Sequence, residues 1–255
     1  MHKRLNVEGL IGINFAYSQG VYKGIYLALS GAVLKHTQMD IISQNLANAD
    51  TIGYKKDQIT FKDYLIPQDS FSIDPDGRAM SYVSTFRTDL SAGNLIKTGN
   101  LLDIAIEGKG FISLEGSRYT RRGDLKKNSE GYLTTQNDIK VLGEKGPIKL
   151  PEGVLQINES GDLFVDGEKV DSLRIVDFQK PENLIRAGGE IFLSKDKPSK
   201  AKGAVKQGYL EKSNVEIVKE MVRMIEMYRE FESYQKAIQF FDDAQGKATN
   251  EIAKI

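Results

Sequence analysis

The chain has 255 residues, and its 35 lysines and arginines balance 35 aspartates and glutamates, which gives a formal net charge of +0. A neutral chain has no electrostatic attraction for nucleic acid or for a membrane surface, so neither is an expected partner. The absence of cysteine excludes disulfides, thiolate nucleophiles and Cys-ligated metals. The length is enough for one or two domains with a real core, and no apolar run reaches the roughly 18 residues of a membrane-spanning helix.

Residues 1–21 have no apolar period, and we interpret them as an extension that is disordered or not translated. We expect the mature chain to begin at Val21, because the apolar seam of the first helix starts directly after it. A weak secretory signal ending near Ser18 is the alternative, although Glu8 and Asn14 interrupt its apolar stretch.

Residues 22–48 are predicted to form a helix whose apolar positions follow a spacing near 3.5 residues, which is typical of a coiled coil. One face carries Ile25, Leu29, Ala32, His36, Met39 and Leu46, and a second row carries Leu27, Leu34 and Ile41. We expect His36 to be a buried, hydrogen-bonded or interface imidazole, not a ligand or a base. The Asn- and Asp-rich stretch that follows ends the helix in a turn, where Gly53 permits positive φ. Residues 57–65 then favour an extended arm or short strand.

The middle of the chain is predicted to be β structure, because all six prolines lie between residues 67 and 198 and short apolar runs alternate with turn signals. Asp166-Gly167 is typical of a two-residue hairpin. Asp74-Pro75-Asp76-Gly77 is a predicted loop that lacks the bidentate Glu of a calcium site. We therefore expect an α+β fold: a discontinuous helical coiled-coil domain from both termini (22–66 and 208–255) with an inserted all-β domain (67–207).

A second long helix is predicted from Ser213 to about Thr249, opened by a capping box of Ser213 and Glu216. Its main apolar seam carries Ile217, Met221, Met224, Tyr228, Phe231, Ile238 and Phe241, again near a 3.5-residue period. Beside this seam runs a second stripe of Val215, Val218, Val222 and Ile225. Two stripes predict that the helix has neighbours on more than one side. A long amphipathic core helix of an ordinary domain is the alternative.

Catalytic and ligand-binding motifs have little support in the sequence. We find no Gly-rich phosphate loop, nucleophile elbow or metalloprotease motif, and we expect no cofactor and no metal. A secreted hydrolase remains the alternative of a different class, with His36 as the only plausible base. Arg122-Gly123-Asp124 matches an integrin-binding tripeptide, but three residues arise often by chance.

Three ordered stretches carry a resemblance to a known family. The first consists of Gly24-Ile25-Tyr26, Ser30-Gly31 and Asn45-Leu46-Ala47-Asn48-x-x-Thr51-x-Gly53-Tyr54-Lys55. The second consists of Ala92-Gly93-Asn94-Leu95-x-x-Thr98-Gly99-Asn100, residues 102–111 and Tyr119-Thr120-Arg121-x-Gly123. The third consists of Gly208-Tyr209-Leu210-Glu211-x-Ser213-Asn214-Val215, Glu220-Met221-Val222 and Arg229-x-Phe231-Glu232. With these motifs the chain resembles the bacterial flagellar basal-body rod proteins, which are axial rod and hook proteins. Asp50, where the family more often has a neutral residue, is a departure.

The resemblance implies a structural subunit of the basal-body rod, without enzymatic activity, whose paired terminal helices self-assemble into the tubular drive shaft. The implied partners are other copies of the chain, neighbouring rod proteins and the flagellar type III export apparatus. The implied location is the part of the rod that crosses the periplasm, reached without a cleaved signal peptide. The sequence around Arg229 and the ordinary size of the β region favour the proximal rod; the distal rod, or another axial hook-family protein, is the alternative.

The expected subunit interface draws on both signatures and on the apolar faces of the two helices. Its N-terminal members are Ile25, Leu29, Met39, Asn45, Leu46, Asn48, Thr51, Gly53 and Tyr54. Its C-terminal members are Leu210, Glu211, Ser213, Asn214, Val215, Val218, Met221, Val222, Met224, Ile225, Tyr228 and Phe231.

Overall fold

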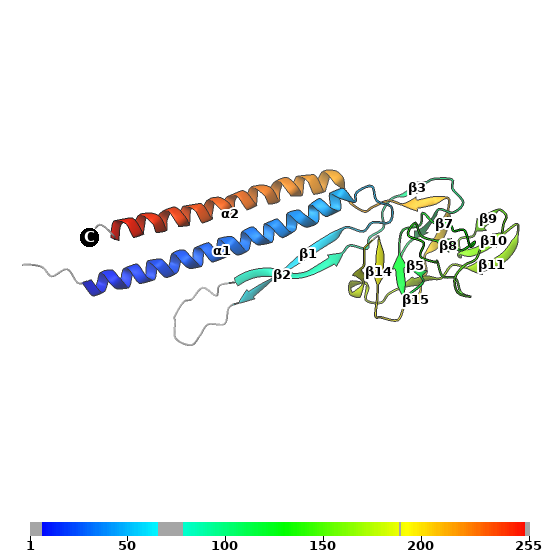
Figure 1. Cartoon of the computed structure of the whole chain (residues 1–255), viewed down its shortest axis with the longest axis horizontal. Coiled ribbons are helices and arrows are strands. Elements are labelled where there is room, and N and C mark those ends of the chain that lie inside the picture. The colour runs from blue at the N-terminus through cyan, green and yellow to red at the C-terminus, as the bar shows by residue number, and fades with distance from the viewer. Residues whose placement is uncertain (1–6, 66–78, 189, 253–255) are drawn as a thin grey trace, which may run out of the picture. The chain divides into compact units, whose positions relative to one another are not determined.

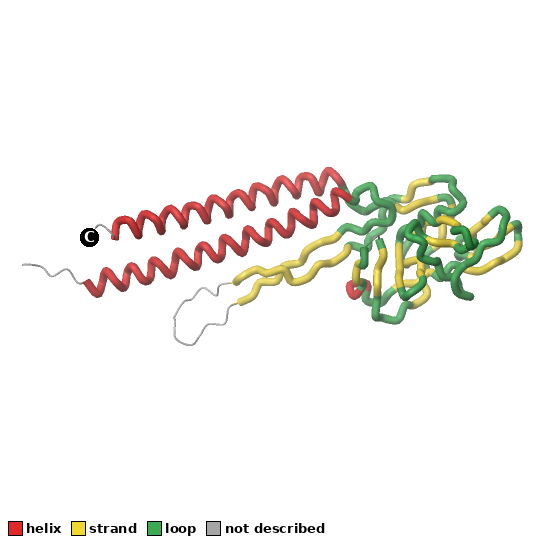
Figure 2. Tube along the Cα trace, in the orientation of Figure 1, coloured by secondary structure: helices red, strands yellow, loops and turns green. Residues whose placement is uncertain are grey.

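The computed structural model describes residues 7–65, 79–188 and 190–252 of the chain (Figure 1). In chain order, the long helix α1 (Val7–Ala47) comes before a succession of short strands and the long helix α2 (Ile217–Ile252) comes after them (Figures 1 and 2). The presence of both helix and sheet, with a helix near each terminus, confirms the predicted α+β class.

The chain divides into two compact units, and each unit is built from segments that are distant in the sequence. The first unit comprises Met1–Ser43, Ile59–Phe86 and Val218–Ile255, and the second comprises Gln44–Gln58 and Arg87–Ile217. The domain boundaries expected from the sequence stay a prediction.

In the first unit, α1 and α2 lie side by side and run antiparallel (Figure 1). A Cβ added to Gly24 would lie 2.7 Å from the ring of Phe241, and one added to Gly31 would lie 2.5 Å from the ring of Tyr234. The two glycines are seven residues apart, as are the two rings. The glycines therefore make room for aromatic side chains of α2 on every second turn of α1.

Polar contacts continue the same pairing of α1 with α2. Lys35 Nζ lies 2.5 Å from a carboxylate oxygen of Glu230. The ring of His36 meets Phe231 edge-on at 6.2 Å between centroids, and His36 Nδ1 lies 3.2 Å from the carboxylate of Asp40. The His36 side chain is 62% exposed, so of the three predicted settings (buried, hydrogen-bonded or interface) the buried one is wrong, and the imidazole lies where α1 meets α2.

Both helices begin at positions other than those predicted. α1 begins at Val7 instead of residue 22, because no proline precedes the predicted start and adding residues to an existing helix is easier than nucleating one. Whether the mature chain begins at Val21 stays a prediction. α2 begins at Ile217 instead of Ser213. The Ser213 hydroxyl accepts the N–H of Val215 at 3.2 Å, two residues on, whereas a capping box would have it accept the third.

Strands β1 (Asp57–Leu65) and β2 (Ala79–Thr88) form a two-stranded sheet, which confirms the extended stretch predicted at residues 57–65. The loop predicted at Asp74 to Gly77, and with it the predicted start of the β domain at residue 67, lie outside the described residues.

The second unit consists of short antiparallel strands in several small sheets. Its largest sheet has the order β13-β14-β6-β5-β12-β15. The bounds in that order are Ile185–Arg186, Ile191–Leu193, Arg118–Thr120, Phe111–Leu114, Ile175–Asp177 and Ser199–Lys200. A three-stranded sheet has the order β11 (Glu168–Ser172), β10 (Asp162–Val165) and β9 (Leu155–Ile157).

Three further pairs and one short helix complete this unit. The pairs are β16 (Ala204–Gln207) with β4 (Ile104–Glu107), β17 (Tyr209–Glu211) with β3 (Leu95–Lys97), and β7 (Lys126–Lys127) with β8 (Leu133–Thr134). The 3-10 helix η1 spans Pro181–Asn183. Asp166 and Gly167 have φ of 50° and 87° between β10 and β11, which is the backbone of the predicted hairpin turn.

Two apolar clusters form the core of the second unit. The larger cluster includes Leu114, Val141 and Leu163, each 0% exposed, and gathers side chains from most of the small sheets. The smaller one is aromatic: Phe111 meets Phe192 and Phe178 edge-on at 5.5 and 6.0 Å. These clusters hold in place the loops that carry the polar residues described below. Neither helix, over its described residues, is long and apolar enough to cross a membrane.

Candidate functional site

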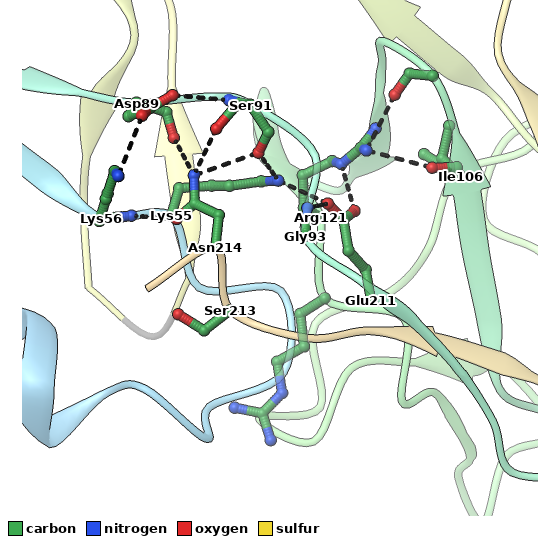
Figure 3. A network of polar contacts seen from close by, with 12 residues as sticks. Lys55, Lys56, Asp89, Ser91, Gly93, Ile106, Arg121, Glu211, Ser213 and Asn214 are labelled. Carbon is green, nitrogen blue, oxygen red and sulfur yellow. Dashed lines mark hydrogen bonds and ion pairs between the residues drawn. The ribbon is translucent and has the colours of Figure 1, made fainter. Parts of the chain in front are cut away.

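A buried ionic cluster around Glu211 is the most prominent polar feature of the second unit (Figure 3). One carboxylate oxygen accepts hydrogen bonds from Lys55 Nζ at 2.6 Å and from the Gly93 N–H at 2.8 Å. The other accepts from Arg121 Nε at 2.8 Å. Glu211 and Lys55 side chains are each 1% exposed, and that of Arg121 is 4% exposed, so two cations and one anion share a site closed to water.

The cluster keeps Glu211 ionised. Burial acts to raise the pKa of this carboxyl, but the charges of Arg121 and Lys55, together with the hydrogen bonds from Lys55 and Gly93, outweigh burial and lower the pKa. For Lys55 burial is the larger influence, and it lowers the pKa of the ammonium group despite the neighbouring carboxylate.

Arg121 joins the cluster to the turn between β4 and β5. Its guanidinium donates to the carbonyl oxygens of Gly110 at 2.7 Å, Gly108 at 2.9 Å and Ile106 at 3.1 Å. Together with the bond to Glu211, these contacts use four donor positions of the planar fork. One side chain therefore fixes a turn of the backbone relative to β17.

The backbone around the cluster requires glycine at two positions. Gly53 has a φ of +70° and donates its N–H to the carbonyl of Glu211 at 2.7 Å, and a Cβ there would lie 2.6 Å from the Arg122 nitrogen. A Cβ on Gly93 would lie 1.9 Å from the carbonyl oxygen of Lys212. The chain segments approach too closely for any side chain at these points.

Asn214 extends the network beside the cluster (Figure 3). Its Oδ1 accepts the N–H of Lys56 at 2.8 Å, and its Nδ2 donates to the carbonyl of Asp89 at 2.8 Å and to Ser91 Oγ at 3.0 Å. Lys55 Nζ also donates to the Ser91 carbonyl at 2.6 Å. The segments before and after the small sheets are thus joined by side chain to backbone hydrogen bonds.

Asn45 makes an equivalent clamp at the end of α1. Its Oδ1 accepts the N–H of Asp57 and its Nδ2 donates to the Asp57 carbonyl, both at 2.9 Å. The Tyr54 hydroxyl donates to the same Oδ1 at 3.1 Å. The guanidinium of Arg186 lies over the Tyr54 ring at 4.5 Å and donates to the Lys55 carbonyl. Burial raises the pKa of Tyr54 to about 12.

The structure divides the residues predicted for a subunit interface into two groups. Those of the two signatures are mostly buried: Asn45, Gly53, Tyr54, Leu210, Glu211 and Ser213. Leu46, Asn48, Thr51, Asn214 and Val215 are half-buried. These residues hold segments of their own chain together, and Asp50 at the edge of the turn lies 3.7 Å from Lys212 with its side chain 87% exposed.

The predicted interface residues on the helices are placed differently. Val218, Met221, Val222, Ile225 and Tyr228 of α2 are exposed, with exposed fractions of 51–76%, and so is Leu29 of α1. Ile25, Met39, Met224 and Phe231 are half-buried. The uncovered apolar surface of α2 therefore combines Val218, Val222 and Ile225 of the predicted second stripe with Met221 and Tyr228, which were predicted to lie in the main seam.

Several residues of the network were missing from the predicted set: Lys55, Lys56, Asp57, Asp89, Arg121 and Arg186. Lys55 and Arg121 lie inside the motifs that carry the resemblance. Their charge, at positions within such motifs, is the sequence signal that could have identified them as members of the network. Arg186 has no sequence signal, because its partners lie about 130 positions earlier in the chain.

The Arg122-Gly123-Asp124 tripeptide is engaged within its own fold. Arg122 Nε lies 2.7 Å from Asp124, and another of its nitrogens lies 3.2 Å from Glu190. A Cβ on Gly123 would lie 1.7 Å from the Ile104 carbonyl oxygen. The contacts of this turn are made within its own unit, where it packs against β4.

Three family models match the chain. They describe a flagella basal body rod protein (residues 25–55), the D1 domain of flagellar hook proteins FlgE/F/G (105–165) and the C-terminal part of flagellar basal body rod FlgEFG proteins (206–251). Lys55, Arg121 and Glu211 each lie in a different one of these three segments.

Similar proteins cover almost the whole chain. It is 29% identical to flagellar basal-body rod protein FlgG of Bacillus subtilis, over 89% of this chain and 98% of the relative. It is 30% identical to FlgG of Borreliella burgdorferi, over 89% and 98%. It is 30% identical to flagellar basal-body rod protein FlgF of Mesorhizobium japonicum, over 82% and 89%.

These matches, on a fold with a helix near each terminus, define a structural protein and not an enzyme, as the sequence predicted. The chain belongs to the family of flagellar basal-body rod proteins, which confirms the resemblance.

Proposed function

We propose that the chain is a self-assembling subunit of the flagellar rod tube and that its two terminal helices form the assembly surface. In this proposal the helices act as a discontinuous coiled-coil domain into which an all-β domain is inserted. The seven-residue spacing of Gly24 and Gly31 against Phe241 and Tyr234 supports the coiled coil.

One observation carries the proposal. The large apolar side chains of α2 that stay uncovered in its pairing with α1 include Val218, Met221, Val222, Ile225 and Tyr228. They recur at spacings of three and four residues, so they form one continuous stripe along the helix. A contiguous apolar surface of this kind marks an interaction site in a protein that otherwise stays in water. In a chain of this family we assign it to neighbouring subunits.

We further propose that the neighbours include other copies of this chain and adjacent rod proteins, and that the chain leaves the cell through the flagellar type III export apparatus without a cleaved signal. For the position in the rod we favour the proximal segment, from the sequence around Arg229 and the size of the β region. The distal segment is the alternative. Electron microscopy of purified basal bodies with this subunit labelled distinguishes the two by the height of the label.

Substitutions in the stripe test the assembly surface. In cells that lack the native copy, Met221→Asp or Ile225→Asp would leave an unpaired charge in a buried contact at a cost of several kcal/mol. We expect loss of swimming and loss of the subunit from isolated basal bodies. Gln235→Asp adds the same charge at an exposed position about 80° around α2 from Ile225, and it should swim normally.

The β structure provides the second readout. Circular dichroism of the purified Asp variants should show the strand signal of the unsubstituted protein, since both positions are exposed in the single chain. Normal swimming of both stripe variants would contradict the proposal, and so would equal loss of swimming in the Gln235→Asp strain.

A further inference from the structure

A second apolar patch lies on α1. Tyr26, Leu29 and Val33 are 65%, 48% and 57% exposed and follow one another at spacings of three and four residues. They form the α1 patch. The stripe of Val218, Met221, Val222, Ile225 and Tyr228 forms the α2 patch. Both patches lie in the first unit, so their relative placement follows from the contacts between the two helices.

The two patches point to opposite sides of the helix pair. Val33 is two residues from both Gly31 and Lys35, which contact α2, so it lies about 160–200° around α1 from that contact. Ile225 is likewise two residues before Met227, whose sulfur lies 3.9 Å from Lys35 Nζ. Val33 in the α1 patch and Ile225 in the α2 patch therefore face away from the partner helix of their own chain.

The patches are also offset along the helix axis. Gly31 faces Tyr234 and Lys35 pairs with Glu230, so in the antiparallel pair Leu29 lies level with about residue 236 of α2. Ile225 is eleven residues from that level, which corresponds to about 16 Å. Surfaces that face opposite ways at different heights cannot join two copies through a closed two-fold contact. They suit a head-to-tail contact that repeats without closing.

The residue spacing within the α1 patch matches the spacing within the α2 patch when the two helices are placed antiparallel. The steps from Tyr26 to Leu29 to Val33 are three and four. The steps from Tyr228 back to Ile225 and to Met221 are also three and four. An α1 patch laid on an α2 patch of another copy thus brings three apolar pairs together at once.

We propose that the α1 patch of one subunit packs on the α2 patch of the next, with Leu29 opposite Ile225 and the two copies offset by about three helical turns along the axis. This inference rests on the proposed function and adds which surface of each copy meets which. The occupant of each patch is a second copy of this chain.

The area of the contact sets how the copies associate. Eight side chains, each about half exposed and each roughly 150–200 Å² in size, bury on the order of 700 Å² in total. Stable complexes bury about 1,200–2,000 Å². One such contact is too small for a stable dimer, so the chain is a monomer in dilute solution. A copy with both patches filled is held by two contacts within an array.

Cysteine crosslinking tests the pairing directly, because the native chain has no cysteine. The pair Leu29→Cys with Ile225→Cys is introduced into the full chain, in cells that lack the native copy. Isolated basal bodies are oxidised mildly and run on a non-reducing gel. A disulfide requires Cα atoms within about 7 Å, so a bridge inside one chain is excluded by the 16 Å offset. We expect a ladder of covalent multimers from the double variant and only monomer from either single variant.

The controls separate this inference from the proposed function. Leu29→Cys with Gln235→Cys keeps one partner and moves the other off the α2 patch, and it should give no ladder. Absence of the unsubstituted chain from basal bodies would overturn the proposed function itself. If the unsubstituted chain is incorporated, covalent dimers from Ile225→Cys alone would overturn the head-to-tail pairing, because they require two α2 patches to meet. A ladder from Leu29→Cys with Val222→Cys, and none with Ile225→Cys, would overturn the register.

As a second pair in the same register, Val33→Cys with Met221→Cys should give the same ladder. Failure of both pairs to crosslink in incorporated protein would also overturn the pairing.

Discussion

Replacing Glu211 with glutamine removes the negative charge that Lys55 and Arg121 share and changes little in shape. Both cations then remain buried, with one amide oxygen and one amide N–H₂ group where two carboxylate oxygens stood. Because the N–H₂ group cannot accept, one cation loses its hydrogen bond as well as its counter-charge. The substitution therefore tests whether the cluster stabilises the second unit through charge.

Removing one partner of a buried ion pair costs about 3–5 kcal/mol, because the other charge stays buried and unbalanced. This is a large part of the roughly 5–15 kcal/mol by which a domain is stable. At about 2–4 °C per kcal/mol for a domain of this size, the melting temperature should fall by roughly 6–20 °C. Glu107→Gln is the matched control. Glu107 is 57% exposed and pairs with Lys206 at 2.9 Å, so its loss should cost less than about 1 kcal/mol.

Urea unfolding followed by circular dichroism measures the difference, since the chain has no tryptophan to report by fluorescence. Lys55→Met added to Glu211→Gln should recover part of the loss, because one buried cation then remains instead of two. Acid provides an independent check. The folded pKa of Glu211 lies below its ordinary value of 4.5, so its contribution is present above that pH and is lost as the pH falls through the lowered value. A Glu211→Gln variant as stable as Glu107→Gln would refute this account of the cluster.

Two further predictions concern single positions. Gly246→Ala should stabilise α2 by about 1 kcal/mol from helix propensity alone, because nothing lies within 4 Å of the added Cβ. Gly31→Ala should gain nothing or lose stability, since its Cβ would lie 2.5 Å from the Tyr234 ring, and thermal unfolding compares the two. Tyr54 has its pKa raised to about 12, above its ordinary 10.0, so the stability linked to its neutral form is present below pH 10 and lost between about pH 10 and 12. Tyr54→Phe should remove that part of the alkaline slope, and a slope unchanged in the variant would contradict the assignment.

The elements of the fold could be predicted from the sequence because their signals are local. The 3.5-residue spacing indicated both helices, and Asp166-Gly167 indicated its hairpin. The start of α2 could not be predicted. Its local capping signal competes with the bonds of Asn214 to the backbone of Lys56, Asp89 and Ser91, which keep residues 213–216 out of the helix. Those partners lie more than 120 positions earlier in the chain.

The buried cluster was only partly predictable for the same reason. Asn45, Gly53 and Glu211 entered the expected interface through the family motifs, but the motifs do not say that these residues face inward. Arg121 lies in a family motif, but the motif does not indicate its role, because that role depends on where β4 and β5 bring the turn between them. Exposure, which decides whether a residue holds its own chain or meets another, is a property of the packed structure.

A buried charge cluster suits the place where it occurs. Lys55, Arg121 and Glu211 come from three parts of the chain that are separated by more than sixty residues, and each lies in a segment matched by a different family model. Apolar side chains would hold these segments together about as well, since well-packed apolar replacements of buried ion triads are often as stable. They would tolerate small slips between segments, however, because apolar packing has no direction. The carboxylate of Glu211 must meet Lys55, Arg121 and the N–H of Gly93 at hydrogen-bonding distance, so one register alone satisfies it. The cluster thus contributes to a single arrangement of β17 with the turn after α1, which the apolar core alone would leave less well defined.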